Sequence, residues 1–272
     1  MPNYRGACHI HSTFSSDGIL SIGSIAQYYR SKNYHFVCLT DHSPKEDGET
    51  FTEEEMSELI RQCEQSSTDD FIIIPGLECE TVDKWHILAI GIKEPVDHVE
   101  WKPILKDIRR QGGIAVLAHP LFFENKYPDD FLYDLDGIEV WNAMKGKKYP
   151  EVTAVNKIKK LTEEGSKITG FFGQDLHRIK DHMNLDIIIS EDELSTSSVV
   201  KAFRSKAYLL RSPAYELTPM ADFPFSTILR FSISGWLYYR SRKLMKRLYQ
   251  SISSNGVRLP DRLLKYGRDH YS

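Results

Sequence analysis

Seven short apolar runs, separated by polar or helical stretches, constrain the fold of this chain more than any other feature. They are rich in Ile, Val and Phe and have the length of buried strands: GACHI, HFVCLT, FIIIPGLEC, WHILAIG, IAVLAHP, GIEVWN and ITGFFG. Strands that alternate with helices predict a parallel sheet, and about seven repeats suit a closed barrel better than an open sheet. We therefore expect an α/β fold of the TIM-like barrel type.

Four helices are expected between these strands, at residues 22–32, 52–66, 98–111 and 150–164. Their ends carry recognisable signals. Ser21 precedes the first helix, and Thr52 and Glu55 have the spacing of a capping box at the start of the second. The pair Gly112-Gly113 ends the third helix, and Gly165 ends the fourth.

Side chains of the types that bind metals stand at the ends of the apolar runs. In a parallel barrel the carboxyl ends of the strands converge on one mouth, where such side chains would meet. His86 is the mild exception, because it opens its run instead of ending it. The candidate ligands are His9, His11, Asp17, His42, Glu78, His86, His119, Asp175 and His177.

Each candidate ligand, taken alone, has an ordinary structural explanation. His9 and His11 stand two apart on an extended strand and so face the same side, but strand histidines also occur half-buried without a metal. Asp17 lies in a turn before glycine and suits an Asx turn. Buried groups of these types are costly unless they are paired. Their joint occurrence at successive strand ends therefore favours a metal site.

Six imidazoles and three carboxylates exceed what one ion needs, since zinc typically takes three or four protein ligands. We therefore expect two to three divalent transition metal ions, with a carboxylate shared between neighbours. A mixed nitrogen and oxygen shell suits Zn²⁺, Mn²⁺ or Fe²⁺ and argues against Ca²⁺ or Mg²⁺. Such ions would turn bound water into the attacking hydroxide near neutral pH and neutralise charge on a phosphoryl oxygen, with no protein nucleophile assigned.

With these motifs the chain resembles the PHP family (polymerase and histidinol phosphatase domain). The matching segments are HIHSTFSSDG at 9–18, LTDHS at 39–43, PGLECE at 75–80, HILAIG at 86–91, AHP at 118–120 and GQDLH at 173–177. They come in the family's order and cover about residues 5–180. The resemblance implies a distorted (β/α)7 barrel with a trinuclear metal site at its C-terminal mouth.

The resemblance also implies how the ligands divide among three ions. One ion would take His9, His11, Glu78 and Asp175, a second would take Glu78 as the bridge with His86 and His119, and a third would take Asp17, His42 and His177. Two departures from the family pattern are visible. Glu80 is a second carboxylate close to Glu78, and Gln174 stands where many members have serine. Neither departure removes a ligand.

Members of this family mostly hydrolyse phosphomonoesters or nucleotide-type phosphodiesters. The resemblance therefore implies a metal-dependent phosphoesterase that acts on a small phosphorylated substrate or a short nucleotide. Two alternatives stay open. One is a metal-dependent hydrolase of C–N bonds, as in amidohydrolase-type barrels, which would have a carbamylated lysine or fewer ligands. The other is a non-catalytic metal-binding module, although a structural site needs no spare coordination.

Cations near the metals would help to bind a phosphate. Arg178 directly follows the last candidate ligand, and the lysine-rich loop 145–148 follows the strand GIEVWN at the same rim. Arg178 and Lys147 are candidate substrate contacts, although loop lysines are commonly only solvated. Glu139 and Asn142, which close that strand, are candidates for supporting a ligand or for an ordinary hydrogen-bonded strand end.

Charge is divided unevenly along the chain, whose formal net charge is −3. Residues 225–272 carry ten Lys/Arg against two Asp, a net of +8, which leaves −11 for the rest. We expect residues 1–212 to form the metal-binding barrel. Residues 213–272 are expected to form a basic helical extension, packed on the barrel or tethered to it. Its apolar face and later basic residues suit packing, or docking on an anionic surface or a partner subunit.

No apolar run approaches the about eighteen residues of a membrane span, and the first residues form no signal peptide. The cysteines form no CxxC pair and lack the spacing of a disulfide framework. Cys8 and Cys79 neighbour candidate ligands, and because adjacent strand positions face opposite ways, they are expected to pack behind the site. We expect a cytoplasmic protein with reduced thiols.

Overall fold

A computed structural model of the chain describes residues 1–44, 50–120, 126–145, 149–224, 226–231, 233 and 240. The chain divides into two compact units, Met1–Phe223 and Pro224–Ser272. The boundary expected from the sequence lies between residues 212 and 213. The last strand of the first unit, Glu216–Leu217, pairs with the strand before it, so the sheet extends past that position.

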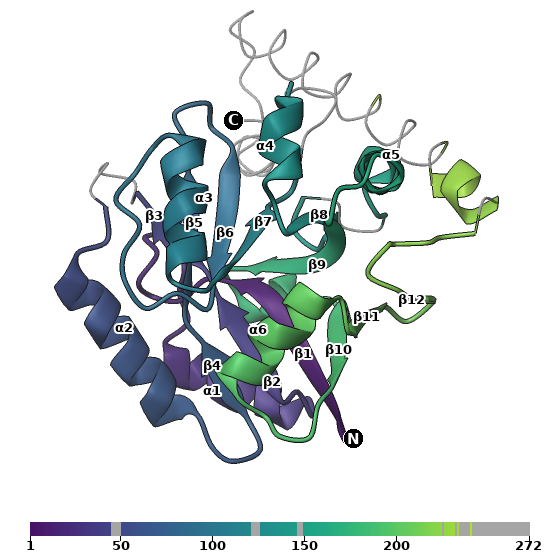
Figure 1. Ribbon diagram of the computed structural model, residues 1–272. Coiled ribbons are helices and arrows are strands. Elements are labelled where there is room, and N and C mark those ends of the chain that lie inside the picture. Colours follow the sequence, from purple (N-terminus) through teal and green to yellow (C-terminus); the bar gives the residue numbers. More distant parts are fainter. Residues whose placement is uncertain are drawn as a thin grey trace, which may run out of the picture. The chain divides into compact units, whose positions relative to one another are not determined.

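The first unit is a mixed α/β fold built on one large sheet (Figure 1). Its strands are β1 Asn3–Ile10, β2 Phe36–Leu39, β3 Asp41–Ser43, β4 Ile72–Ile74, β5 Gly76–Glu80, β6 His86–Ile90, β7 Ile114–Leu117, β8 Gly137–Asn142, β9 Thr169–Leu176, β10 Asp186–Ser190, β11 Tyr208–Arg211 and β12 Glu216–Leu217. The pairing order is β12-β11-β10-β1-β9-β8-β7-β6-β5-β3, and β2 pairs with β1 and β4. All seven apolar runs form strands, as predicted.

The sheet is not parallel throughout, because β6 runs antiparallel to both β5 and β7. Only five residues, 81–85, connect β5 to β6. A parallel crossover needs about a dozen residues or more, whereas a short connection can only form a hairpin. The reversal brings the start of β6 to the edge where the parallel strands end. It therefore explains why His86 opens its run while the other strand ligands close theirs.

The pairing of the described strands does not close into the predicted barrel. One predicted strand, FIIIPGLEC, is interrupted, because Pro75 separates β4 from β5. Thr40, the last residue of the run HFVCLT, separates β2 from the additional strand β3. Proline has no amide hydrogen and cannot donate to a strand ladder. As a result β4 pairs with β2, whereas β5 pairs with β3 and β6.

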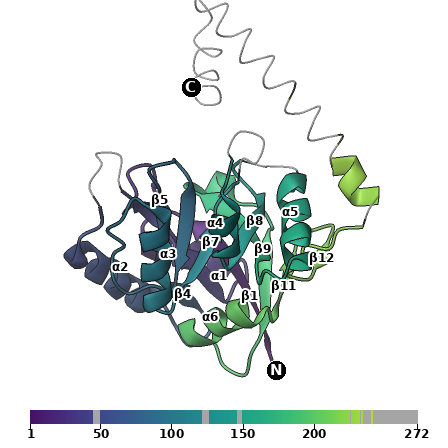
Figure 2. The ribbon, with the colours of Figure 1, turned by 45° about the horizontal axis from the view of Figure 1, so that its top comes forward.

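The helices pack on the outer face of the sheet, with α2 against β4, α3 against β7 and α5 against β8 (Figures 1 and 2). They are α1 Ile22–Ser31, α2 Glu53–Ser66, α3 Trp101–Arg110, α4 Asp129–Tyr133, α5 Val152–Glu163 and α6 Thr196–Ser205, with a 3₁₀ turn at Ile179–Asp181. The four predicted helices are confirmed within three residues at each end. The side chain of Ser21 caps α1, and Thr52 and Glu55 form the predicted capping box.

The segment between residues 179 and 217 was not predicted from the sequence, and it contains β10, α6, β11 and β12. Strand β10 pairs antiparallel with β1 and continues the sheet beyond the seven predicted strands. Its side chains Ile187, Ile188 and Ile189 are all buried. Helix α6 is capped at its C-terminal end by Lys206, which adopts a left-handed conformation with φ +61°.

In the second unit, residues 226–231, 233 and 240 are helical, within the stretch where a basic helix was expected. Leu229 and Ile233 are exposed. Phe225, Trp236 and Leu237, from the same stretch, lie outside the described residues. Among the residues that the structure describes, no helix is long and apolar enough to cross a membrane.

Candidate metal centre

The nine candidate ligands come together at one edge of the sheet, where β1, β3, β5 and β9 end and β6 begins. Three groups have ligand atoms within 4.8 Å of one another: His11, Asp17, His42 and His177; His9, Glu78 and His119; His9, His11 and Asp175. His86 joins them through a contact of 2.8 Å between its Nδ1 and Oε1 of Glu78. We call these nine residues the ligand cluster.

Glu78 lies at the centre of the ligand cluster and is almost completely buried. Its Oε1 lies 2.8 Å from Nδ1 of His86 and 3.0 Å from Nε2 of His119. Its Oε2 faces a different set of ring nitrogens: Nδ1 of His42 at 3.1 Å, Nε2 of His9 at 3.4 Å and Nε2 of His11 at 3.4 Å. A carboxylate with its two oxygens directed at separate histidine sets has the geometry of a bridge between two sites.

Asp17 forms the solvent-facing side of the ligand cluster, since its side chain is 45% exposed. Its Oδ2 lies 2.9 Å from Nε2 of His177, and its Oδ1 lies 3.5 Å from Nε2 of His42. The ring of His11 stacks on that of His177, with centroids 4.1 Å apart. Because Asp17 is exposed, a ligand arriving from solvent would meet Asp17 and its neighbours His42 and His177 first.

Five buried polar atoms of the ligand cluster lie close to other members but make no hydrogen bond of suitable geometry within the described part of the chain. They are Nε2 of His9, Nε2 of His11, Oε2 of Glu78, Oδ2 of Asp175 and Nε2 of His177. Burying a polar atom without a partner is costly, and native proteins rarely do so without a functional reason. Imidazole nitrogen and carboxylate oxygen are the donors that Zn²⁺, Mn²⁺ and Fe²⁺ accept. These residues therefore fit divalent transition metals.

Three members of the ligand cluster have left-handed backbone conformations: His9 with φ +64°, His119 with φ +27° and Asp175 with φ +49°. Such conformations cost about 1–3 kcal/mol each in residues other than glycine and concentrate at functional sites. The ladder of β1 also shifts register between Ala7 and Ile10, around His9. His9 and His11 therefore reach the same centre through an irregular strand end, not through the simple alternation that the sequence suggested.

Glu139, on β8, supports two members of the ligand cluster at once. Its Oε1 lies 2.7 Å from Nδ1 of His9, and its Oε2 accepts hydrogen bonds from the backbone N–H of His119 at 2.6 Å and from Nδ2 of Asn142 at 2.9 Å. The sequence left open whether Glu139 and Asn142 support a ligand. The geometry places Glu139 directly behind His9.

A second buried carboxylate, Asp41, supports His11 through a serine and had no role in the sequence analysis. It accepts hydrogen bonds from the backbone N–H of Ser12 at 2.7 Å and from the hydroxyls of Ser12 and Ser15 at 2.8 and 2.6 Å. The oxygen of Ser15 in turn lies 3.2 Å from Nδ1 of His11. The serines of HSTFSS were the available signal, because a buried aspartate needs donors nearby.

Burial and mutual charge shift the pKa values within the ligand cluster in opposite directions. Burial disfavours the charged forms of His9 and Glu78, but the charges around them outweigh it, so the pKa of His9 is raised and that of Glu78 is lowered. Burial lowers the pKa of His11. Asp17 and Glu78 overcome burial and raise the pKa of His42 to about 10. Metal binding would displace protons from His9 and His42.

Of the two candidate substrate contacts, Arg178 is exposed next to His177, and Lys147 lies outside the described residues. Glu80 accepts a hydrogen bond from Lys84 and lies 3.2 Å from Nε2 of His86, beside the ligand cluster. Gln174 is fully buried, and its side chain bonds to the backbone of residues 183 and 185.

The cysteines take the expected place. All four are free and buried, and burial raises the pKa values of Cys8 and Cys79. Neither thiol belongs to a group that could hold a metal in the described chain. Both therefore pack behind the ligand cluster instead of joining it.

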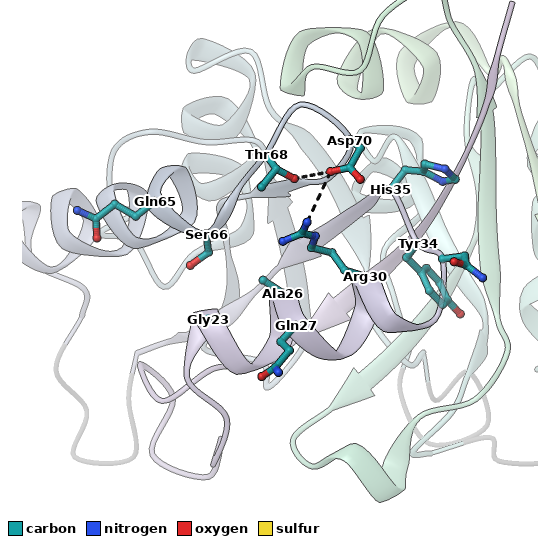
Figure 3. Close-up of a pocket in the computed structure, with 11 residues that line it drawn as sticks. Gly23, Ala26, Gln27, Arg30, Tyr34, His35, Gln65, Ser66, Thr68 and Asp70 are labelled. Atoms are coloured by element: carbon teal, nitrogen blue, oxygen red, sulfur yellow. Dashed lines mark hydrogen bonds and ion pairs between the residues drawn. The ribbon is translucent and has the colours of Figure 1, made fainter.

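A hollow of about 670 Å³ lies away from the ligand cluster, between α1 and the end of α2 (Figure 3). Arg30, Tyr34 and Asp70 contribute to its lining, and Arg30 approaches Asp70 to 3.9 Å. None of the nine candidate ligands lines this hollow. The candidate site is therefore the ligand cluster.

The fold and the ligand cluster define an α/β protein with a histidine- and carboxylate-rich metal centre. The PHP domain family model matches residues 7–170, and the chain belongs to the PHP domain family. No curated protein matches its sequence.

Solved structures with this fold come from several organisms. A two-domain protein from Bacteroides vulgatus ATCC 8482, containing a predicted PHP-like metal-dependent phosphoesterase, has a TM-score of 0.62 at 17% identity. The match covers 78% of this chain and 65% of that one.

Two further structures are similar at 15% identity, each with a TM-score of 0.51. PsfC from Pseudomonas syringae PB-5123 matches over 89% of this chain and 99% of its own, and the lesion-specific endonuclease PfuEndoQ from Pyrococcus furiosus over 75% and 56%. At these identities the likeness establishes the fold alone.

Proposed function

We propose that this chain is a metal-dependent phosphoesterase that hydrolyses phosphomonoesters or nucleotide-type phosphodiesters at the ligand cluster. The observation that carries the proposal is the set of five buried ring-nitrogen and carboxylate-oxygen atoms of the ligand cluster that make no hydrogen bond within the described chain. Membership of the PHP domain family supports the same reaction. The fold shared with an endonuclease is a reason to include nucleotide diesters among the substrates tested.

Three ions would divide the ligand cluster. His9, His11, Glu78 and Asp175 would hold one, Glu78, His86 and His119 a second, and Asp17, His42 and His177 a third. The opposed directions of the two Glu78 oxygens support the bridging role. Zinc, manganese or iron would activate water and neutralise charge on a phosphoryl oxygen.

The chain's own residues would orient the substrate. A phosphate ester would approach from the side of Asp17, whose side chain is 45% exposed. The guanidinium of Arg178, next to His177, would bind a phosphate oxygen. Lys147 stays a second candidate for that role. The cytoplasmic address and an anionic or protein partner for the basic C-terminal segment also stay predictions.

The distorted barrel of the family is also part of the proposal. Strands β2 and β3 are separated by one residue, as are β4 and β5, so each pair could act as a single interrupted strand. When β2/β3 and β4/β5 each count as one strand, the described pairings run in a ring from β1 through β2/β3, β4/β5, β6, β7, β8 and β9 back to β1.

A hydrolysis screen tests the proposed function. The full chain would be assayed with Mn²⁺ and with Zn²⁺ for phosphate release from phosphomonoesters and for nucleoside monophosphate formation from nucleotide diesters, beside Asp175→Ala as the matched inactive variant. We expect product formation that requires metal and is lost in the variant. Hydrolysis of amides without hydrolysis of either phosphate ester would favour the C–N hydrolase. Full metal loading with neither activity would favour a non-catalytic metal-binding module.

A further inference from the structure

Glu139 is a buried carboxylate that touches two members of the ligand cluster from different strands without belonging to any of its candidate metal-holding groups. Both carboxylate oxygens of Glu139 are occupied by protein partners. Oε1 faces Nδ1 of His9, and Oε2 accepts hydrogen bonds from the backbone N–H of His119 and from the side chain of Asn142. Its position indicates that it acts on the metals through His9 and His119.

We propose that Glu139 is the positioning residue of this metal centre. It sets the tautomer of His9 and holds the backbone of His119. The inference rests on the proposed function only in assuming that the ligand cluster binds metal ions.

The contact with His9 determines which ring nitrogen can bind a metal. A neutral imidazole carries one N–H, and the nitrogen without hydrogen is the one that ligates. Because the Glu139 carboxylate only accepts, Nδ1 of His9 must carry the hydrogen. The lone pair is then on Nε2, which lies 3.4 Å from Oε2 of Glu78 and 3.7 Å from Oδ1 of Asp175. The free nitrogen therefore faces the centre.

The contact with His119 acts on the backbone. His119 has φ +27°, a conformation that persists only where its surroundings impose it. Its N–H donates to Glu139 at 2.6 Å, and its Nε2 reaches Oε1 of Glu78 at 3.0 Å. One carboxylate thus fixes the second ligand as well as the first.

The chain keeps space for this carboxylate by placing a glycine on the neighbouring strand. A Cβ atom at Gly173 would lie 1.7 Å from Oε1 of Glu139. Any side chain at this position would therefore expel the carboxylate from its hydrogen bonds. Gly173→Ala should disturb the same two ligands without removing Glu139.

The sharpest variant is Glu139→Gln, which keeps the shape but adds two amide hydrogens. If the amide NH₂ faces His9, the hydrogen must leave Nδ1, and Nε2 then carries it and cannot ligate. If the NH₂ faces the other way, it meets the N–H of His119 and the NH₂ of Asn142, both donors. Neither orientation preserves the network.

Zinc binding by the full chain, measured by competition with a chromophoric chelator, tests the proposal. We expect Glu139→Gln and Gly173→Ala each to weaken zinc affinity about 10–100-fold, the loss typical of residues that orient a ligand. Asp186→Asn is the matched control: it also turns a buried acid into an amide, but it touches no member of the ligand cluster. It should keep wild-type affinity.

Long-range ¹H–¹⁵N spectra of the zinc-loaded wild-type chain should show the His9 hydrogen on Nδ1. Wild-type zinc affinity in Glu139→Gln would overturn the proposal, as would an equal loss in the Asp186→Asn control. Should Glu139→Gln fail to fold, Gly173→Ala decides by the same criterion. These measurements involve no phosphate ester, so a failure of the proposed hydrolysis would leave their outcome standing.

Discussion

Two polar clusters lie at opposite ends of β1, and they differ in how fully their atoms are paired. Near its start, Arg5 binds Asp186 through Nε at 2.8 Å and Nη2 at 3.1 Å, and Tyr34 donates to the same carboxylate at 2.5 Å. His182 completes this group, 3.2 Å from the Tyr34 oxygen. We call these four residues the Arg5–Asp186 cluster. At the other end, five buried atoms of the ligand cluster make no hydrogen bond within the described chain, and three of its residues have left-handed backbone conformations.

The contrast separates a stabilising group from a functional one. A buried charge is tolerated when its partners satisfy it, as Asp186 is. A cluster that leaves donors and acceptors unpaired, in strained conformations, gives up stability unless a ligand completes it. Substitutions at the two ends of β1 should therefore have opposite signatures.

The largest effect is expected in the ligand cluster. His11→Ala and Asp175→Ala should each lower hydrolysis by more than about 100-fold, the upper end of the loss typical of residues that only orient a ligand. The folded state should persist, because neither side chain holds the sheet together. Phosphate release and a thermal melt with chelator present would check both statements. Near wild-type turnover with a full metal load would remove either residue from the site.

The reverse signature is expected for Asp186→Ala. It leaves the Arg5 guanidinium and the Tyr34 hydroxyl without their acceptor, and breaking such a pair costs about 3–5 kcal/mol when both partners are buried. Because the Arg5 side chain is 27% exposed, we expect about 3 kcal/mol. Denaturant unfolding would measure this loss, while turnover per folded molecule stays unchanged. A stable variant with impaired turnover would erase the distinction between the clusters.

Metal removal should destabilise the wild-type chain by a similar or smaller amount. An ion that binds only the folded state contributes about 2.7 kcal/mol when its free concentration is 100 times its dissociation constant. Melting with and without chelator should show this shift in the wild type and in Asp186→Asn. The shift should shrink in His11→Ala. An equal shift in all three proteins would mean that metal binds elsewhere.

The smallest effect is a pH dependence in the Arg5–Asp186 cluster. Burial lowers the pKa of His182, so the unfolded chain binds its proton more readily than the folded chain. The contribution of neutral His182 is therefore fully present above about pH 6.5, the unfolded value, and is lost as the pH falls below it. His182→Gln should flatten the stability profile between about pH 5 and 7. An unchanged slope would show that other groups set it.

The sequence predicted the strands and singled out nine side chains that the structure brings together, because apolar runs and the polar residues that end them are local patterns. The direction of each strand was harder to predict from the sequence. The reversal of β6 follows from the five-residue connection after Glu80, and periodicity does not report connection length. The support of His9 by Glu139 depends on which strands are neighbours in the sheet. The space that Gly173 on β9 leaves for Glu139 on β8 becomes visible only when these two strands are paired.

The segment that holds Asp186 was missed for a related reason. Its strand pairs with β1 from about 180 residues away, and the acid Asp186 is paired by Arg5 on β1 and by Tyr34. Asp41 was given no role from the sequence, because its partners Ser12 and Ser15 follow another strand. Pairing across long sequence separations is what a single sequence conceals.

The metal content of the purified chain tests the central claim most directly. Nine ligand-type side chains converge where one ion would use about four. After growth in metal-supplemented medium, elemental analysis should give two to three equivalents of zinc, manganese or iron per chain, with fewer in His11→Ala and no change in Asp186→Asn. One equivalent or less in the wild-type chain would contradict the account.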